Sequence, residues 1–105
     1  MRTLEFNAHK QLLQKDPACD FSNIAPGTCG YLVAHFNFLS AEWEGCTKAA
    51  SFWHNGEEHA ELLKNDACVI PTGAMTGRKF EVSVVGVRGG NYRITSTRTT
   101  VRQEG

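Results

Sequence analysis

The sequence has no run of about 18 apolar residues, the length that a helix needs to cross a membrane. It also has no apolar segment behind Met1 of the kind that a secretion signal carries. Neither sign of charge is in excess, because 11 Lys and Arg balance 11 Asp and Glu. A general coat for nucleic acid needs a basic excess. We therefore expect neither a membrane partner nor direct nucleic-acid binding.

Motifs that carry catalysis are missing as well. The sequence has no GxSxG, no SxxK and no Gly-rich phosphate loop that opens a helix. His54 and His59 are five residues apart rather than four, and the Asn55-Gly56 turn would interrupt a helix, so HExxH chemistry is excluded. We interpret the two histidines as a surface pair flanking a hairpin, with a weak adventitious metal site as the alternative. The sequence predicts no enzyme, no cofactor and no metal.

The cysteines show no metal-binding or secretory pattern. No two of them have CxxC spacing, which argues against a zinc ribbon, and without a secretory context we expect free thiols. Cys46 and Cys68 lie in alternating apolar segments and are expected to be buried. Cys19 and Cys29 bracket a loop with Pro and Gly, and whether they pair is left open.

What the chain does have is alternation of apolar and polar residues with a period of two, which is typical of strands. Leu32, Ala34, Phe36 and Phe38 fall on one face of the clearest of these segments. Strands are predicted at 2–9, 31–38, 46–54, 58–64, 67–70, 79–87 and 92–102. We expect an all-β fold with few or no helices, an antiparallel Ig-like β-sandwich of about seven strands, with a small partly open barrel as the alternative.

Turn signals divide the chain in agreement with this fold. Residues 11–28 are polar and carry two prolines, which predicts a long connection with one helical turn around 20–23. Asn55-Gly56 predicts a tight hairpin, and Trp43 is expected to plug one end of the core. We predict a single domain over 1–105, in which 2–28 form the first strand and a long irregular connection and 29–105 form the core strands.

Charge is distributed unevenly along the chain. Residues 1–70 carry five basic and nine acidic side chains, or −4, and residues 71–105 carry six basic and two acidic ones, or +4. One interpretation is a set of cross-strand ion pairs on solvated faces. The other is an Arg-rich edge that docks on an acidic partner.

Candidate contact residues lie at the predicted hairpin tip and along the basic C-terminal strand. A tryptophan beside the tip suits either the core or a protein contact, and both interpretations of Trp53 stay open. Stacking of RNA on exposed Tyr31, Trp53 and Tyr92, or of carbohydrate on Trp53 and Tyr31, is a weaker hypothesis. The candidates for partner binding are Trp53, His54, Glu57, Glu58, Arg88, Arg93, Arg98 and Arg102.

Several structural motifs after residue 31 fit a known group of proteins. They are Phe36-Asn37-Phe38, Trp43-Glu44-Gly45, Cys68-Val69-Ile70-Pro71, the strand from Phe80 to Gly86, and Tyr92-Arg93-Ile94-Thr95-Ser96-Thr97. In these the chain resembles small Ig-like β-sandwich proteins encoded by phages and prophages of Gram-positive bacteria.

The resemblance implies a phage-encoded, non-enzymatic protein-binding module. It would be a virion accessory protein of the tail, baseplate or decoration type, found in the host bacterial cytoplasm or in the virion, with a virion component as its partner. The alternative is a soluble inhibitor of a host defence nuclease, of the anti-CRISPR type. Such an inhibitor would compete with nucleic acid through the glutamates between Glu42 and Glu61. Edge strands also leave room for a homo-oligomer.

Overall fold

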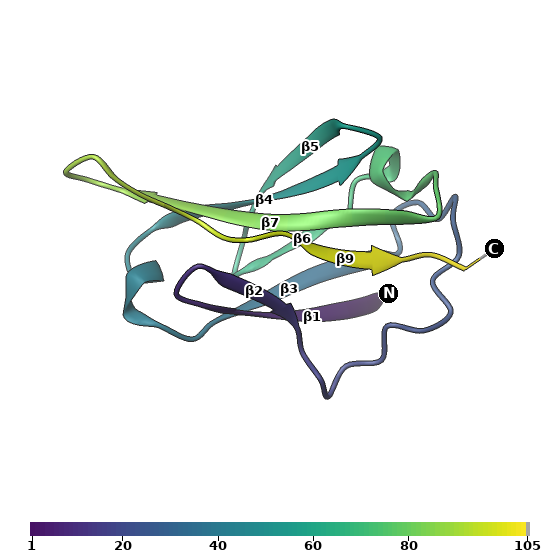
Figure 1. The fold of residues 1–105 in the computed structure, drawn as a ribbon, viewed down its shortest axis with the longest axis horizontal. Helices are drawn as coiled ribbons and strands as arrows, with labels where there is room; N and C mark the ends of the chain where they lie inside the picture. The colour runs from purple at the N-terminus through teal and green to yellow at the C-terminus, as the bar shows by residue number, and fades with distance from the viewer. Residues whose placement is uncertain (105) are drawn as a thin grey trace.

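A computed structural model describes residues 1–104 as two β-sheets packed face to face (Figure 1). The first sheet has the strand order β2 (Leu12–Lys15), β1 (Arg2–His9), β3 (Leu32–Phe38) and β6 (Ala67–Val69). The second sheet has the order β5 (Glu57–Leu62), β4 (Thr47–His54), β7 (Lys79–Arg88) and β8 (Tyr92–Thr95), and β9 (Thr99–Arg102) also pairs with β7. The fold is an all-β sandwich, as the alternation predicts.

One strand pair departs from the predicted antiparallel arrangement, because β1 and β3 run parallel, with Glu5 opposite His35. The chain doubles back through β2 and then returns along 16–31, so that β3 enters the sheet in the same direction as β1. A parallel pair needs a long crossover of this kind. The long connection was expected, but the strand at its start and the direction in which it delivers the chain were not.

The structure has nine strands rather than about seven. The extra ones are β2, which lies inside the expected connection, and a division of the expected strand 92–102 into β8 and β9. The helical turn expected around 20–23 is not formed. Instead, the Arg2 guanidinium donates hydrogen bonds to the carbonyl oxygens of Asp20 and Ser22, at 2.9 and 2.6 Å, and fixes that segment in an irregular path.

Short 3-10 turns are the only helices among residues 1–104, η1 (Ala41–Trp43) and η2 (Thr72–Met75). In this part of the chain no helix has the length and apolar character to span a membrane. The second turn lies in the loop after Pro71.

The core lies between the two sheets and follows the alternation. Phe6 and Phe36 stack across the parallel pair with ring centroids 5.2 Å apart. Trp43 is 1% exposed, and its indole N–H donates to the carbonyl oxygen of Lys10 at 2.7 Å, so it closes one end of the sandwich as predicted. The largest fully buried side chains are Trp43, Phe6, Phe36, Phe52, Phe80, Leu4, Ile24, Met75, Val82, Val84 and Val101.

Candidate functional site

Trp53 lies on the outer face of the second sheet, not in the core. Its neighbour in sequence, Phe52, points inward and is fully buried, so the alternation of β4 turns Trp53 outward. The indole N–H donates to the hydroxyl of Ser83 on β7 at 3.1 Å, and Ser83 is only 8% exposed beneath it. The ring is therefore partly exposed but fixed in orientation, which decides between the two interpretations in favour of a surface position.

A bulge between β8 and β9 brings Arg98 over this ring. Three residue steps on β7, from Val85 to Val82, are opposed by four steps on the other side, from Thr95 to Thr99. The extra residue interrupts the ladder, as a β-bulge does. Ser96 replaces a ladder hydrogen bond at the bulge, because its hydroxyl accepts a hydrogen bond from the backbone N–H of Val84 at 2.9 Å.

The Arg98 guanidinium carbon lies 3.8 Å from the centroid of the Trp53 ring. The same guanidinium contacts the Glu81 carboxylate at 3.3 Å, and Glu81 is the cross-strand neighbour of Trp53 on β7. On the other side, Glu58 of β5 is opposite Trp53 and accepts a hydrogen bond from the Ser51 hydroxyl. A stacked cation and two carboxylates therefore frame the ring. We call this group of residues the Trp53 surface (Trp53, Ser83, Glu58, Glu81 and Arg98).

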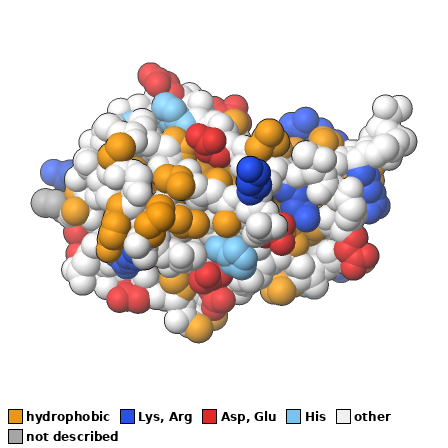
Figure 2. Space-filling model, turned by 180° about the vertical axis from the view of Figure 1, so that it is seen from behind, with side chains coloured by type: hydrophobic (Ala, Val, Ile, Leu, Met, Phe, Trp, Pro, Cys, Tyr) orange, Lys and Arg blue, Asp and Glu red, His pale blue; other side chains and the backbone are white. Residues whose placement is uncertain are grey.

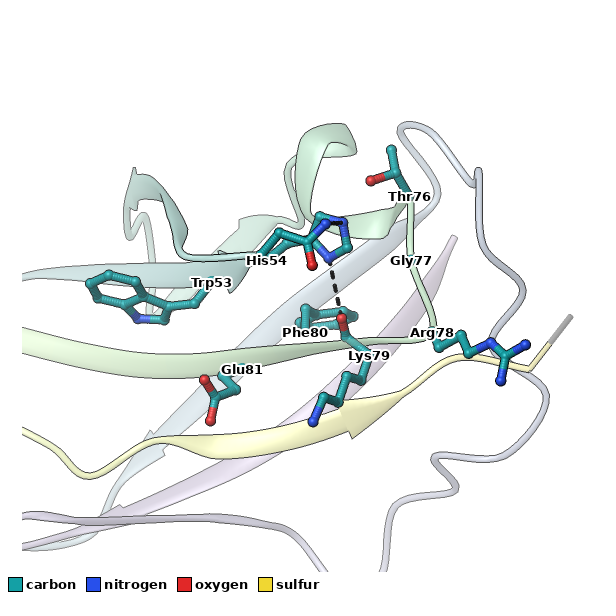
Figure 3. A pocket seen from close by; sticks show the side chains of 9 residues that line it. Trp53, His54, Thr76, Gly77, Arg78, Lys79, Phe80 and Glu81 are labelled. Carbon is teal, nitrogen blue, oxygen red and sulfur yellow. Dashed lines mark hydrogen bonds between the residues drawn. The ribbon is translucent and has the colours of Figure 1, made fainter.

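A shallow groove of about 420 Å³ runs beside the ring. Figure 3 shows Trp53 and His54 projecting from β4, and Lys79 and Glu81 from β7. The His54 ring points to the Lys79 carbonyl oxygen, 3.4 Å away. The groove is lined by Trp53, His54, Asn55, Thr76, Gly77, Arg78, Lys79, Phe80 and Glu81.

Two cations occupy facing positions on neighbouring strands beside this groove. Lys79 on β7 is directly opposite Arg102 on β9, and both side chains are exposed on the outer face. Like charges directly opposite each other destabilise a sheet. Within residues 1–104, neither has a carboxylate within 4 Å.

Ion pairing does not connect the acidic and basic parts of the chain. The three ion pairs formed among residues 1–104 are Glu5–His35, Lys48–Asp66 and Glu81–Arg98, and each lies wholly within 1–70 or within 71–105. Acidic and basic side chains are interspersed on the back of the molecule (Figure 2). Glu5–His35 and Glu81–Arg98 are cross-strand pairs of the kind that the first interpretation expects, but the other five cations of 71–105 form no ion pair among residues 1–104.

The other candidate residues lie at different places. Glu57 is exposed at the hairpin tip opposite His54, on the face away from Glu58. Arg88 is seven residues along β7 from Glu81, or roughly 23 Å from the Trp53 surface at about 3.3 Å per residue. There it stacks on Tyr92 at 4.0 Å and donates to the carbonyl oxygen of Glu44 at 2.7 Å. The structure thus unites Trp53, His54, Glu58, Arg98 and Arg102 and leaves Arg88 and Arg93 apart.

A second groove, of about 370 Å³, lies at that far end of the sheet. It is lined by Lys10, Gln11, Glu42, Tyr92, Arg93 and Ile94. The backbone N–H of Glu42 and the Ser40 hydroxyl hold the pKa of the Glu42 carboxyl below its ordinary value. The lining carries two cations, Lys10 and Arg93, and one carboxylate, Glu42, so its basic excess is a single charge.

His54 and His59 do not face each other as a metal site. Each ring packs on a glycine of the loop around η2, His54 on Gly77 and His59 on Gly73, so closely that a Cβ on either glycine would collide with the ring. Among the described residues, no three side chains of His, Cys, Asp or Glu form a cluster suited to a metal ion. The histidines serve here to seat the loop against the hairpin.

The four cysteines are free thiols. Cys19 lies against the backbone of β1, where its sulfur accepts from the Glu5 N–H at 3.4 Å, and Cys29 lies beside the Thr72 hydroxyl at 3.2 Å. Cys46 and Cys68 are half-buried against the core rather than buried as expected. Partial burial, with the nearby Glu61 carboxylate, raises the pKa of the Cys68 thiol to about 12. A reactive cysteine needs the opposite shift.

The three aromatic residues considered for stacking do not share a surface. Trp53 lies on the outer face of the second sheet, and Tyr31 precedes β3 in the first sheet and is 51% exposed. Tyr92 is half-buried, and its hydroxyl donates to the carbonyl oxygen of Glu42 at 2.9 Å. A platform for RNA bases or sugars would need them side by side.

Sequence reasoning missed Ser83, Glu81 and Lys79 as parts of the site. A signal was present in β7, where Lys79, Glu81 and Ser83 alternate with the buried Phe80 and Val82 and so must share one outer face.

Comparisons with known protein families, with curated proteins and with solved structures find no match to this chain.

Proposed function

We propose that this chain is a non-enzymatic protein-binding module whose contact surface is the Trp53 surface together with the adjoining groove. The observation that carries the proposal is the stacked pair of Trp53 and Arg98, at 3.8 Å. Tryptophan and arginine dominate the energetics of protein interfaces. Because the Ser83 hydrogen bond and the stacking fix the ring before binding, less conformational entropy is lost when a partner covers it.

The partner's contact surface carries carboxylates beside an apolar position. Lys79 and Arg102 repel each other across β7 and β9, and an acidic group between them would remove that repulsion. Glu81 is already occupied by Arg98, so the groove beside it is basic through Arg78 and Lys79. The apolar position belongs over the exposed part of the Trp53 ring.

The resemblance to phage Ig-like proteins makes a virion component the partner to be tested first. Detection of the chain in purified particles of the encoding phage would support a tail, baseplate or decoration role. Its consistent absence from particles would overturn that role, although not protein binding itself.

Comparative capture tests the binding surface. The unsubstituted chain, Trp53→Ala and Tyr31→Ala serve as baits in extracts of phage-infected cells, with recovery quantified by mass spectrometry. Tyr31 is the control because it is exposed elsewhere. We expect one partner whose recovery falls about tenfold or more with Trp53→Ala and is unchanged with Tyr31→Ala. Equal recovery by all three folded baits would refute the proposal.

The exposed carboxylates of β5 favour a second candidate function, inhibition of a host defence nuclease. Glu57, Glu58 and Glu61 project from the same edge strand and are all exposed, and such a strand can compete for a basic nucleic-acid channel. Expression of the chain would then rescue plaque formation under nuclease restriction. A variant with Lys at these three positions should lose the rescue, and no rescue by the wild type would dispose of this candidate.

A further inference from the structure

An unpaired strand edge lies along β5, the upper margin of the molecule in Figure 1. β5 pairs with β4 on one side only, and five of its six residues are exposed. It is as long as an average strand, and it lacks the proline or bulge with which many proteins block an edge.

The hairpin geometry decides which backbone groups of β5 point outward. Asn55 and Gly56 have φ values of +51° and +79°, as a two-residue type I′ turn requires. The pair that closes such a turn, His54 and Glu57, exchanges both backbone hydrogen bonds, and hydrogen-bonded and open pairs then alternate along the strands. The N–H and C=O groups of Glu58, Ala60 and Leu62 therefore face away from β4.

We infer that β5 pairs with β5 of a second copy of this chain, antiparallel and centred on Ala60. In this register Ala60 lies opposite the other copy's Ala60, and Glu58 lies opposite the other copy's Leu62. The outward groups then form six backbone hydrogen bonds, and the second sheets of two molecules become one. A twofold dimer of this kind is the commonest oligomer of soluble proteins.

Charge complementarity selects this register over its neighbours. Centring on Ala60 places each His59 opposite the other copy's Glu61, so an imidazole faces each Glu61 and no carboxylate faces another carboxylate across the interface. Centring on Glu58 or on Glu61 would put two identical carboxylates directly opposite each other, which is destabilising. Centring on His59 would place Glu57 opposite Glu61.

Leu62 supplies the apolar contribution. It is 73% exposed, the most exposed large apolar side chain after Met1, and it lies on the same face of β5 as Ala60. In the dimer the methylene groups of Glu58 and the methyl group of Ala60 from the other copy cover it. Because the dimer interface is small, the dimer is weak and its population depends on concentration.

The dimer has a consequence for the Trp53 surface. Trp53 is opposite Glu58 on the outer face, so the joined sheets present two copies of the Trp53 surface on one continuous face. Bivalent display of this kind strengthens binding to a repetitive partner. The dimer does not depend on the proposed binding function, and its tests need no partner.

Sedimentation velocity of the full chain over a range of concentrations tests the inference. We expect a concentration-dependent approach to twice the 11.6 kDa of one chain. Ala60→Lys places two ammonium groups opposite each other at the centre and should raise the dissociation constant by about tenfold or more. Ala60→Pro removes an N–H that no bond within the chain uses, so it should block the dimer with little effect on the monomer. Leu12→Lys, a matched change on the edge strand β2, should leave the dimer unchanged.

Amide hydrogen exchange locates the dimer interface. The amides of Ala60 and Leu62 should exchange about tenfold more slowly in concentrated than in dilute samples, while the amides of His59 and Glu61, bonded to β4, should be protected at both concentrations. A wild-type chain that stays monomeric up to millimolar concentration overturns the inference. So does a dimer that survives both Ala60→Lys and Ala60→Pro.

Discussion

Arg98 lies flat over the indole of Trp53, with the guanidinium carbon 3.8 Å from the ring centroid, although the two residues are 45 positions apart in sequence. The contact exists because β4 turns Trp53 outward and the bulge after β8 swings Arg98 onto the same face. A cation above a partly exposed ring contributes about 0.5–1 kcal/mol. The contact therefore matters more for the orientation of the ring than for the stability of the fold.

Replacing Arg98 with Ala should loosen that orientation. We expect Arg98→Ala to lower the free energy of unfolding by about 0.5–1 kcal/mol and to increase acrylamide quenching of tryptophan fluorescence. Trp43 is buried, so added quenching reports on Trp53. Arg98→Lys, which keeps the charge but not the flat stacking, should give an intermediate result. Unchanged quenching in Arg98→Ala would show that the stacking does not hold the ring.

Reversing the charge at Arg102 should stabilise the free chain and at the same time weaken partner binding. Arg102→Glu replaces a like-charge pair with an attractive one opposite Lys79, so the free chain should become more stable by about 0.2–1 kcal/mol. The same change should abolish binding of the acidic partner. Arg93→Glu is the control, because Arg93 lies opposite Val87 at the far end of the sheet. Urea unfolding and partner recovery measure the two effects, and a variant that is stabilised yet still binds would speak against an acidic partner.

Gly86 and Gly89 should respond differently to the same substitution. A Cβ at Gly86 would lie 3.0 Å from Cβ of Cys46 and 3.1 Å from Cε3 of the buried Trp43, so Gly86→Ala should cost about 1–3 kcal/mol. A Cβ at Gly89 meets no atom within 4 Å, and Gly89→Ala should change stability by less than about 0.5 kcal/mol. Chemical denaturation compares them, and equal costs would contradict the packing of Trp43 against β7.

The Cys68 thiol should make stability fall at alkaline pH. Its pKa is raised from 9.0 to about 12 by burial and by Glu61, so the folded chain keeps the proton that the unfolded chain loses. The contribution of the protonated Cys68 thiol to the free energy of unfolding is complete below pH 9 and is lost as the pH rises from 9 through about 12. Wild type should therefore lose more stability than Cys68→Ala between pH 8 and pH 10.5, as urea unfolding measures. Parallel losses in the two proteins would show that the thiol is not shielded.

Much of the fold follows from local sequence. The alternation in Leu32–Phe38 and in Phe80–Val84 predicts which side chains reach the core, and Asn55-Gly56 predicts the hairpin. The parallel pairing of β1 with β3 could not be predicted, because it depends on where a long connection delivers the chain. β2 escaped detection because its four residues carry adjacent leucines instead of an alternating pattern.

The candidate site was predictable in part. Ile94 and Val101 both point inward although seven residues separate them, which one regular strand cannot achieve. This break in the alternation of inward and outward side chains indicates a bulge, and the bulge brings Arg98 to Trp53. Local pattern could not supply the register that places Lys79 opposite Arg102, because register is decided by contacts between distant segments.

Amide hydrogen exchange of the chain alone and in complex with its captured partner shows whether the partner covers the Trp53 surface. We expect new protection along the outer face of the second sheet, at residues 51–54, 79–83 and 98–102, with no change in β1 and β3. Protection confined to the first sheet or to the groove beside Tyr92 and Arg93 would contradict it.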